Sequence, residues 1–142
     1  MSGKTERETR IILISPASDV TPDQLVRTIH AMGRNVTVKE SCYGSVLEGE
    51  KEVVREVIAE VKKLDPNGIF TKVRAYHAGD PRRCRAHHGT RPGFAQLEQE
   101  WHDLWKIQYG LDRADSGEKA SERKEIKKLD VNEFKKICEV RQ

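Results

Sequence analysis

The sequence lacks any long apolar run. Its longest uncharged apolar stretch is residues 11–14, far below the ~20 residues that a membrane-spanning helix needs. The polar start at residues 1–8 contains no apolar signal-peptide core. Hydrophobic residues make up only 36% of the 142 residues, and charged residues make up 35%. We therefore expect a soluble cytoplasmic protein with no membrane partner. Part of the chain is expected to contribute little to a hydrophobic core or to become packed only on binding a partner.

Cysteine is scarce and widely spaced. The three cysteines are Cys42, Cys84 and Cys138, and this odd number excludes a framework of paired disulfides. The chain also lacks a glycine-rich phosphate loop, a paired-carboxylate motif and a Ser-His-Asp ordering. Because no complete catalytic constellation is visible, we predict that the protein is not an enzyme.

The positive charge is concentrated in one short stretch. Residues 77–93 contain four arginines and one aspartate and so carry +3, which equals the net charge of the whole chain. Residues 1–76 carry +1 and residues 94–142 carry −1. A partner is therefore most expected at residues 77–93, called here the basic arm.

Six elements with clear start and stop signals fill the first half of the chain. The predicted elements are a strand at 10–15, a helix opened by Thr21-Pro22, strands at 36–41 and 45–49, a helix at 50–64 and a strand at 69–76. This order predicts an α+β fold of the ferredoxin-like split βαβ type. In that fold an antiparallel sheet carries both helices on one face.

The second half has a different character. The basic arm has hardly any aliphatic residue, whereas the segment that follows repeats apolar residues at helical spacing and contains Trp101 and Trp105. Asp130 and Glu133 form a capping-box pattern near the end of the chain. The predicted organisation is a flexible N-terminus at 1–9, a ferredoxin-like domain at 10–76, the basic arm at 77–93, a Trp-bearing helix at 94–109, a linker at 110–120 and a C-terminal helix at 121–142.

Arginine and tryptophan make the basic arm and the next helix candidates for protein binding. Arginine pairs well with carboxylates and carbonyls, and tryptophan often anchors interface cores. The two tryptophans are four residues apart and share a helix face, so the helix either covers its own sheet, contacts a partner, or does both. The candidate partner-binding residues are Arg82, Arg83, Arg85, His87, His88, Arg91, Trp101 and Trp105.

Two other chemistries are weaker candidates at the same place. Cys42, Cys84 and His87 are candidate metal ligands, but the paired spacings of zinc sites are absent. Cys84 is also a candidate nucleophile, since neighbouring arginines favour a thiolate, but no orienting third group is evident. A polar loop with exposed histidines explains the pattern more simply.

Nucleic acid is an unfavoured partner. Arginines interleaved with histidines could follow a phosphate backbone. However, an RNA-recognition domain of this topology stacks bases on aromatic residues of its central strands, and the strands at 10–15 and 45–49 contain none.

Four segments resemble methanogenesis marker protein 6. They are TPDQLV at 21–26, VKESCYG at 38–44, KLDPN at 63–67 and GDPRRCRAH at 79–87, and the likeness covers roughly residues 10–105. The resemblance implies an archaeal methanogen and a role tied to methyl-coenzyme M reductase, the methane-forming nickel enzyme. Marker proteins of this kind are associated with its assembly, modification or ATP-dependent reductive activation. The resemblance supplies no catalytic residue.

The leading hypothesis is therefore a non-catalytic subunit that docks on methyl-coenzyme M reductase or its assembly and activation factors. The alternative is a redox component that uses Cys42, Cys84 and His87. Because an iron–sulfur cluster normally takes about four thiolates, three cysteines favour lending a ligand to a cluster or metal held by a partner. An RNA-binding module is the least favoured hypothesis.

Overall fold

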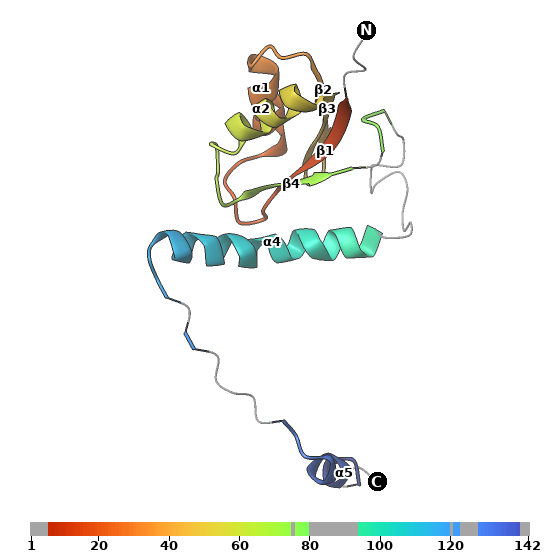
Figure 1. Ribbon diagram of the computed structural model, residues 1–142, viewed down its shortest axis with the longest axis vertical. Helices are drawn as coiled ribbons and strands as arrows, with labels where there is room; N and C mark the ends of the chain where they lie inside the picture. Colours follow the sequence, from red (N-terminus) through yellow and green to blue (C-terminus); the bar gives the residue numbers. More distant parts are fainter. Residues whose placement is uncertain (1–5, 75, 80–93, 120, 123–127, 140–142) are drawn as a thin grey trace.

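The computed structural model describes residues 6–74, 76–79, 94–119, 121–122 and 128–139. These residues form a mixed α+β protein with four strands and four helices (Figure 1). The elements are β1 (Arg7–Ile14), α1 (Pro22–Ala31), β2 (Val36–Ser41), β3 (Gly44–Glu50), α2 (Lys51–Val61), β4 (Ile69–Val73), α4 (Phe94–Asp115) and α5 (Val131–Glu139).

The four strands form one antiparallel sheet in the order β2-β3-β1-β4. The predicted order of strands and helices is confirmed, as is the β2–β3 hairpin. The predicted start of the first strand at residue 10 is wrong, because β1 pairs with β3 from Arg7, opposite Glu50. Residues 7–9 are polar, so the hydrophobic pattern did not indicate a strand there. They belong to β1 and not to a flexible N-terminus.

Helices α1 and α2 cover one face of the sheet. Thr21 caps α1, since its Oγ1 accepts a hydrogen bond from the Gln24 backbone N–H at 3.2 Å. Leu25 of α1 and Val57 of α2 are almost fully buried. They pack against alternate strand residues such as Ile12, as a strand's two-residue period requires. The prediction of two helices on one face is therefore confirmed.

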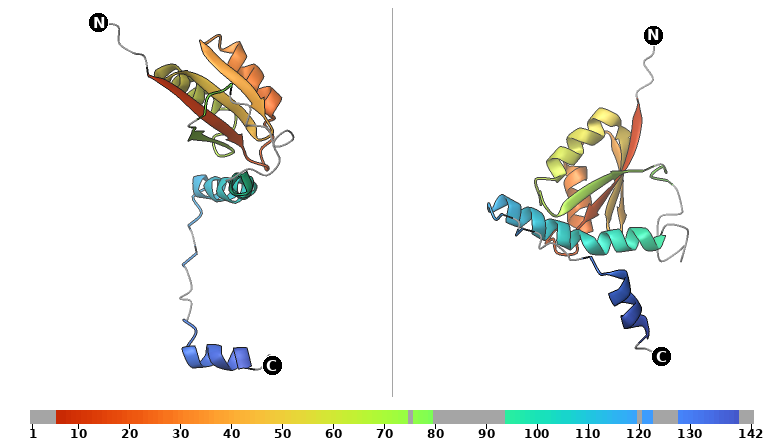
Figure 2. Two further views of the ribbon diagram at one scale, coloured as in Figure 1. Left: turned by 90° about the vertical axis from the view of Figure 1, so that its right-hand side faces the viewer. Right: turned by 60° about the horizontal axis from the view of Figure 1, so that its bottom comes forward.

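Helix α4 covers the opposite face, so the sheet lies between two helical layers (Figure 2). Ile11 and Leu13 of β1 point to this side, one residue out of phase with the face that α1 and α2 cover. They share a second apolar cluster with Leu104, and Leu97 and Trp101 pack against it. Of the alternatives for the Trp-bearing helix, covering its own sheet is therefore confirmed.

Helix α4 is longer than the sequence predicted. It continues through residues 110–115, which were expected to begin a linker. The side-chain amide of Asn67 donates to Asp112 Oδ1 and Asp115 Oδ2, both at 2.8 Å. These contacts come from the loop before β4, so no local pattern could reveal them. Helix α2 and strand β4 end earlier than predicted, at Val61 and Val73.

Helix α5 is shorter than the predicted C-terminal helix at 121–142. It begins at Val131, because Asp130 Oδ1 accepts the Asn132 N–H at 2.8 Å and caps the first turn. No residue of α5 is buried, and the helix stands apart from the body formed by the sheet, α1, α2 and α4 (Figure 1). Within the described residues, no helix has the length and apolar content to cross a membrane.

Candidate partner-binding surface

The structure describes only part of the predicted site. Trp101, Trp105 and Cys42 lie within the described residues. The remaining candidates lie outside them, namely Arg82, Arg83, Cys84, Arg85, His87, His88 and Arg91. The described surroundings of the basic arm are its first residues, at 77–79, and the helix that follows it.

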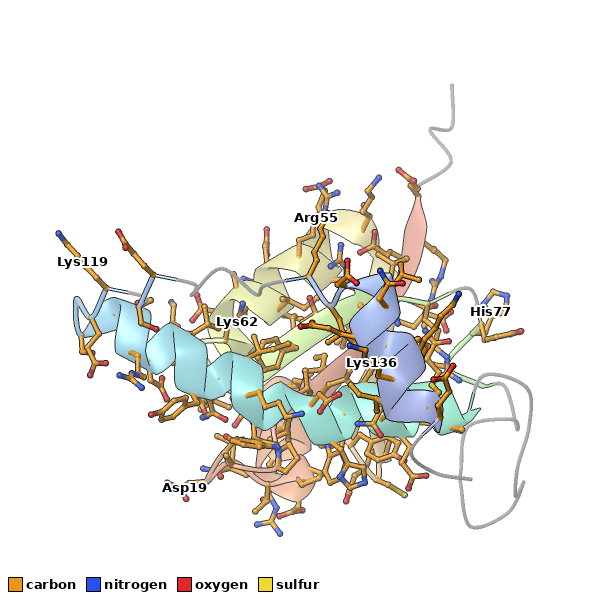
Figure 3. The ribbon with its side chains drawn as sticks, turned by 90° about the horizontal axis from the view of Figure 1, so that it is seen from below. Asp19, Arg55, Lys62, His77, Lys119 and Lys136 are labelled. Atoms are coloured by element: carbon orange, nitrogen blue, oxygen red, sulfur yellow. The ribbon has the colours of Figure 1, made fainter. Side chains whose placement is uncertain are left out.

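Glu48 fixes the start of the basic arm to the sheet. Its Oε2 accepts a hydrogen bond from the Ala78 backbone N–H at 2.6 Å, and Ala78 is 2% exposed. The Glu48 side chain is 15% exposed and also lies 3.4 Å from the Arg7 guanidinium and 3.7 Å from His77 Nδ1. His77 itself is at the margin of the body and projects into solvent (Figure 3). The arm therefore leaves the body at a defined point.

These contacts lower the pKa of Glu48. The main cause is the hydrogen bond from Ala78, and Arg7 and His77 add to it against the opposing effect of burial. A carboxylate that accepts hydrogen bonds in its charged form keeps that form to lower pH.

We expect Glu48 to make stability depend on pH. Because its folded-state pKa lies below the ordinary value of 4.5, its contribution is complete above that pH and is lost as pH falls through the lowered value. In Glu48→Gln the amide oxygen can still accept from Ala78, but the charge is gone. Denaturant titrations should show the wild type more stable than this variant at pH 7, with the difference shrinking as the pH falls below 4.5. A difference independent of pH would contradict this assignment.

Trp101 belongs to the body. Its indole Nε1–H donates to the Ile14 carbonyl at 2.8 Å. Its ring contacts the Tyr43 ring at a centroid distance of 4.9 Å and an interplanar angle of 43°. Tyr43 in turn accepts the Ile14 backbone N–H at 2.7 Å through its carbonyl oxygen. Trp101 therefore ties α4 to the end of β1 and to the β2–β3 turn.

Trp105 and Tyr109 form an exposed aromatic pair on α4. They are 48% and 57% exposed, and their four-residue spacing places them on one side of the helix. The Lys106 ammonium lies 5.9 Å from the Trp105 ring centroid, and the Arg113 guanidinium lies 5.3 Å from that of Tyr109. Sequence reasoning found Trp105 but missed Tyr109, although the i, i+4 spacing was a usable signal.

The loop at 65–68 holds the C-terminal half of α4 in place. Asp65 accepts hydrogen bonds from the Gly68 N–H at 2.8 Å, the Ser18 hydroxyl at 2.5 Å and the Gln108 amide at 3.3 Å. This loop overlaps the KLDPN segment at 63–67. The loop therefore helps to set how far Trp105 and Tyr109 project from the body.

The metal hypothesis receives no geometric test. Cys42 is exposed at the β2–β3 turn, and its proposed co-ligands Cys84 and His87 lie outside the described residues. Within the part of the chain that the structure describes, no three His, Cys, Asp or Glu side chains are grouped to hold a metal ion.

A cavity lies in the layer formed by α1 and α2, on the other side of the sheet from α4. It is an open groove of about 500 Å³ between the end of α1 and α2. Met32, Val57 and Ala59 form its apolar part, and the charged residues Arg34, Glu56 and Glu60 complete its lining. Arg34 and Glu56 pair with each other across 3.4 Å, so the groove offers no convergent set of free polar groups.

Comparison with known proteins places the chain among archaeal proteins. "Uncharacterized protein MJ0498" of Methanocaldococcus jannaschii is 41% identical over 145 aligned positions, covering 94% of this chain and 93% of that protein. No solved structure is a significant match. Residues 11–112 match the family described as "Uncharacterized protein conserved in archaea (DUF2102)". With this match over most of its length, the chain belongs to that archaeal family.

Proposed function

We propose that the protein is a cytoplasmic, non-catalytic accessory subunit that docks on methyl-coenzyme M reductase or on its assembly or reductive activation complex. The four segments that resemble methanogenesis marker protein 6 support this proposal, and three of them lie at described structural junctions. TPDQLV opens α1, VKESCYG leads into the β2–β3 turn that contacts α4, and KLDPN overlaps the loop that holds α4. Membership of an archaeal family agrees with this assignment.

The scaffold in this proposal is a ferredoxin-like domain. The βαββαβ order of elements and the strand order β2-β3-β1-β4 support that assignment. Helix α4 is an addition that closes the sheet's second face and carries the docking side chains on a rigid element.

The exposed aromatic pair is the observation that carries the docking role. Helices already cover both faces of the sheet. No open sheet face therefore remains against which Trp105 and Tyr109 could pack. Tryptophan, tyrosine and arginine are enriched in the cores of protein interfaces, and Arg113 lies over the Tyr109 ring. The pair lies on α4, which follows the basic arm in the sequence, so Arg82, Arg83 and Arg85 precede the same helix along the chain.

Replacing the aromatic pair tests the proposal. We expect Trp105→Ala/Tyr109→Ala to weaken binding to purified methyl-coenzyme M reductase complexes at least tenfold, because buried aromatic anchors often contribute about 2 kcal/mol or more each. The measurement is biolayer interferometry under anoxic conditions. Ile107→Ala is the matched control, since Ile107 is 50% exposed on the same helix but on its other flank. Equal binding by both variants and the wild type would contradict the docking role.

A charge variant extends the same test to the arm. Arg82→Ala/Arg83→Ala/Arg85→Ala should weaken binding and reduce its salt dependence. The control variant, Arg55→Ala/Lys62→Ala/Lys63→Ala, removes three cations in and just after α2, on the other side of the sheet from α4.

Stoichiometric iron or zinc in the purified wild type, lost in Cys84→Ser, would instead favour the metal-linked alternative.

A further inference from the structure

Strand β4 is an open edge of the sheet. It is the last strand in the order β2-β3-β1-β4, so only one of its sides pairs with another strand. The N–H of Arg74, directly after β4, donates to the Thr9 carbonyl at 2.8 Å and so points towards β1. Because the backbone groups of an antiparallel strand alternate in direction, the groups that point outwards belong to Ile69, Thr71 and Val73.

The outward backbone groups of β4 are open to a further strand. The Ile69 N–H confirms their direction, because it donates at 3.1 Å to the carbonyl of Asp65, which lies outside the sheet. Within the part of the chain that the structure describes, the outward N–H groups of Thr71 and Val73 have no hydrogen-bond partner. A row of unpaired backbone groups on an edge strand is a template for pairing with another strand.

The side chains of β4 do not protect this edge. Edge strands that avoid pairing usually carry charges, proline or a bulge. The only charged residue of β4 is Lys72, and its ammonium pairs with Glu100 across 3.0 Å. Val73, at the end of the strand, is 60% exposed. The opposite edge strand, β2, instead carries the exposed charges Lys39 and Glu40 side by side. Strand β4 is therefore the edge that favours pairing.

We propose that the protein forms a two-fold symmetric dimer in which β4 pairs antiparallel with β4 of a second copy. The axis passes beside Thr71, so that Thr71 lies opposite Thr71 of the second copy and Val73 lies opposite its Ile69. Each Thr71 N–H then donates to the other Thr71 carbonyl, and each Val73 N–H donates to an Ile69 carbonyl. The outward groups of this strand are thus complementary to themselves, which a two-fold interface requires.

Side-chain pairing selects this register over its neighbours. Residues directly opposite each other share a face of the sheet, so Phe70 lies opposite Lys72 of the second copy. Moving the axis to Lys72 would place the two lysines opposite each other, which is unfavourable for like charges. Moving it to Phe70 would leave the Val73 N–H unpaired. The register centred on Thr71 avoids both losses.

The dimer extends one continuous sheet and keeps its layers. Because the axis is perpendicular to the sheet, both α4 helices lie on one side, and both pairs of α1 and α2 lie on the other. A pair of five-residue strands buries less than the ~1,600 Å² of a standard interface. The dimer should therefore be in a concentration-dependent equilibrium with the monomer. This inference goes beyond the proposed function and does not depend on it.

Sedimentation equilibrium of the full-length chain tests the dimer, from about 1 μM to about 1 mM. Val73→Glu places a carboxylate in the paired edge and should weaken dimerisation at least tenfold. Val73→Thr is the matched control, because it keeps a β-branched side chain without a charge, and it should change dimerisation less than threefold. Since Val73 is 60% exposed, both variants should fold as the wild type does, which circular dichroism checks.

A symmetric disulfide tests the register. In a chain whose native cysteines are replaced as Cys42→Ser/Cys84→Ser/Cys138→Ser, Thr71→Cys should form a disulfide-linked dimer on mild oxidation. The two Cα atoms of such a hydrogen-bonded pair lie about 5.5 Å apart, which a disulfide can span. Lys72→Cys is the control and should cross-link at least tenfold less, because Lys72 lies opposite Phe70 rather than opposite itself.

Three results would each overturn the proposal. The first is a wild-type chain that stays monomeric over the whole concentration range. The second is a dimer that Val73→Glu leaves as stable as the wild type, since its interface would then lie elsewhere. The third is equal cross-linking of Thr71→Cys and Lys72→Cys, which would show that the chains meet without a fixed register.

Discussion

Replacing Gly44 with alanine is expected to destabilise the domain by at least about 3 kcal/mol. Gly44 begins β3 with φ +147°, a backbone conformation that residues with a side chain rarely adopt. A Cβ at this position would lie 2.2 Å from the Ile12 carbonyl oxygen. That oxygen belongs to the central strand, so it cannot move away without disturbing the pairing of β1 with β3.

Two other glycines give a graded control series for Gly44. Gly33 has φ +60° but open space around it, so Gly33→Ala should cost only about 1–2 kcal/mol. Gly110 lies inside α4 with nothing within 4 Å of its Cβ position, so Gly110→Ala should stabilise by up to about 1 kcal/mol. Urea titrations followed by circular dichroism measure all three. A Gly44→Ala variant that is no less stable than Gly33→Ala would contradict the close approach at the β2–β3 turn.

The same turn shows how far local sequence patterns reach. Strand β2 begins and ends where its alternation predicted, at Val36 and Ser41. Thr21 likewise marked the start of α1. Asp130 carried a capping pattern at the observed start of α5, although the helix was predicted to begin at residue 121. Each of these signals depends on a few neighbouring residues, and this is why they could be read without the fold.

The limits of the prediction lie where distant segments decide the structure. Residues 110–115 contain glycine and aspartate and resemble a linker, yet Asn67 holds them in α4. Glu48 looks like an ordinary polar residue of a strand. Its role depends on the return of the chain at Ala78, which no spacing in the sequence indicates.

The two tryptophans illustrate the same limit at the candidate site. Their spacing places them on one helix face, but it does not fix how the helix is rotated against the sheet. The structure centres the buried side near Leu104 and Trp101, and so leaves Trp105 at its edge. The sequence therefore identified the helix that carries the candidate surface but could not separate the packed tryptophan from the exposed one.

Trp101→Ala is expected to cost about 3 kcal/mol of folding free energy, because it removes the packing of a partly buried indole against Tyr43 and the second apolar cluster. It also leaves the Ile14 carbonyl without its indole donor. Trp105→Ala should change stability by less than about 1 kcal/mol, since the side chain is 48% exposed. Trp101→Phe separates the loss of packing from the loss of the hydrogen bond to Ile14. It keeps much of the packing but removes the hydrogen bond, at a net cost of about 1–2 kcal/mol.

Stability and binding measured on the same variants separate the roles of the two tryptophans. If Trp101 acts only within the body, Trp101→Phe should bind the reductase complex almost as tightly as the wild type wherever it is fully folded. Trp105→Ala should show the reverse, with near-normal stability and weakened binding. Weak binding by a fully folded Trp101→Phe would mean that the partner also contacts Trp101. Unchanged stability of Trp101→Ala would instead show that α4 is not held on the sheet by this residue, and the aromatic pair would then lose the rigid support on which its docking role depends.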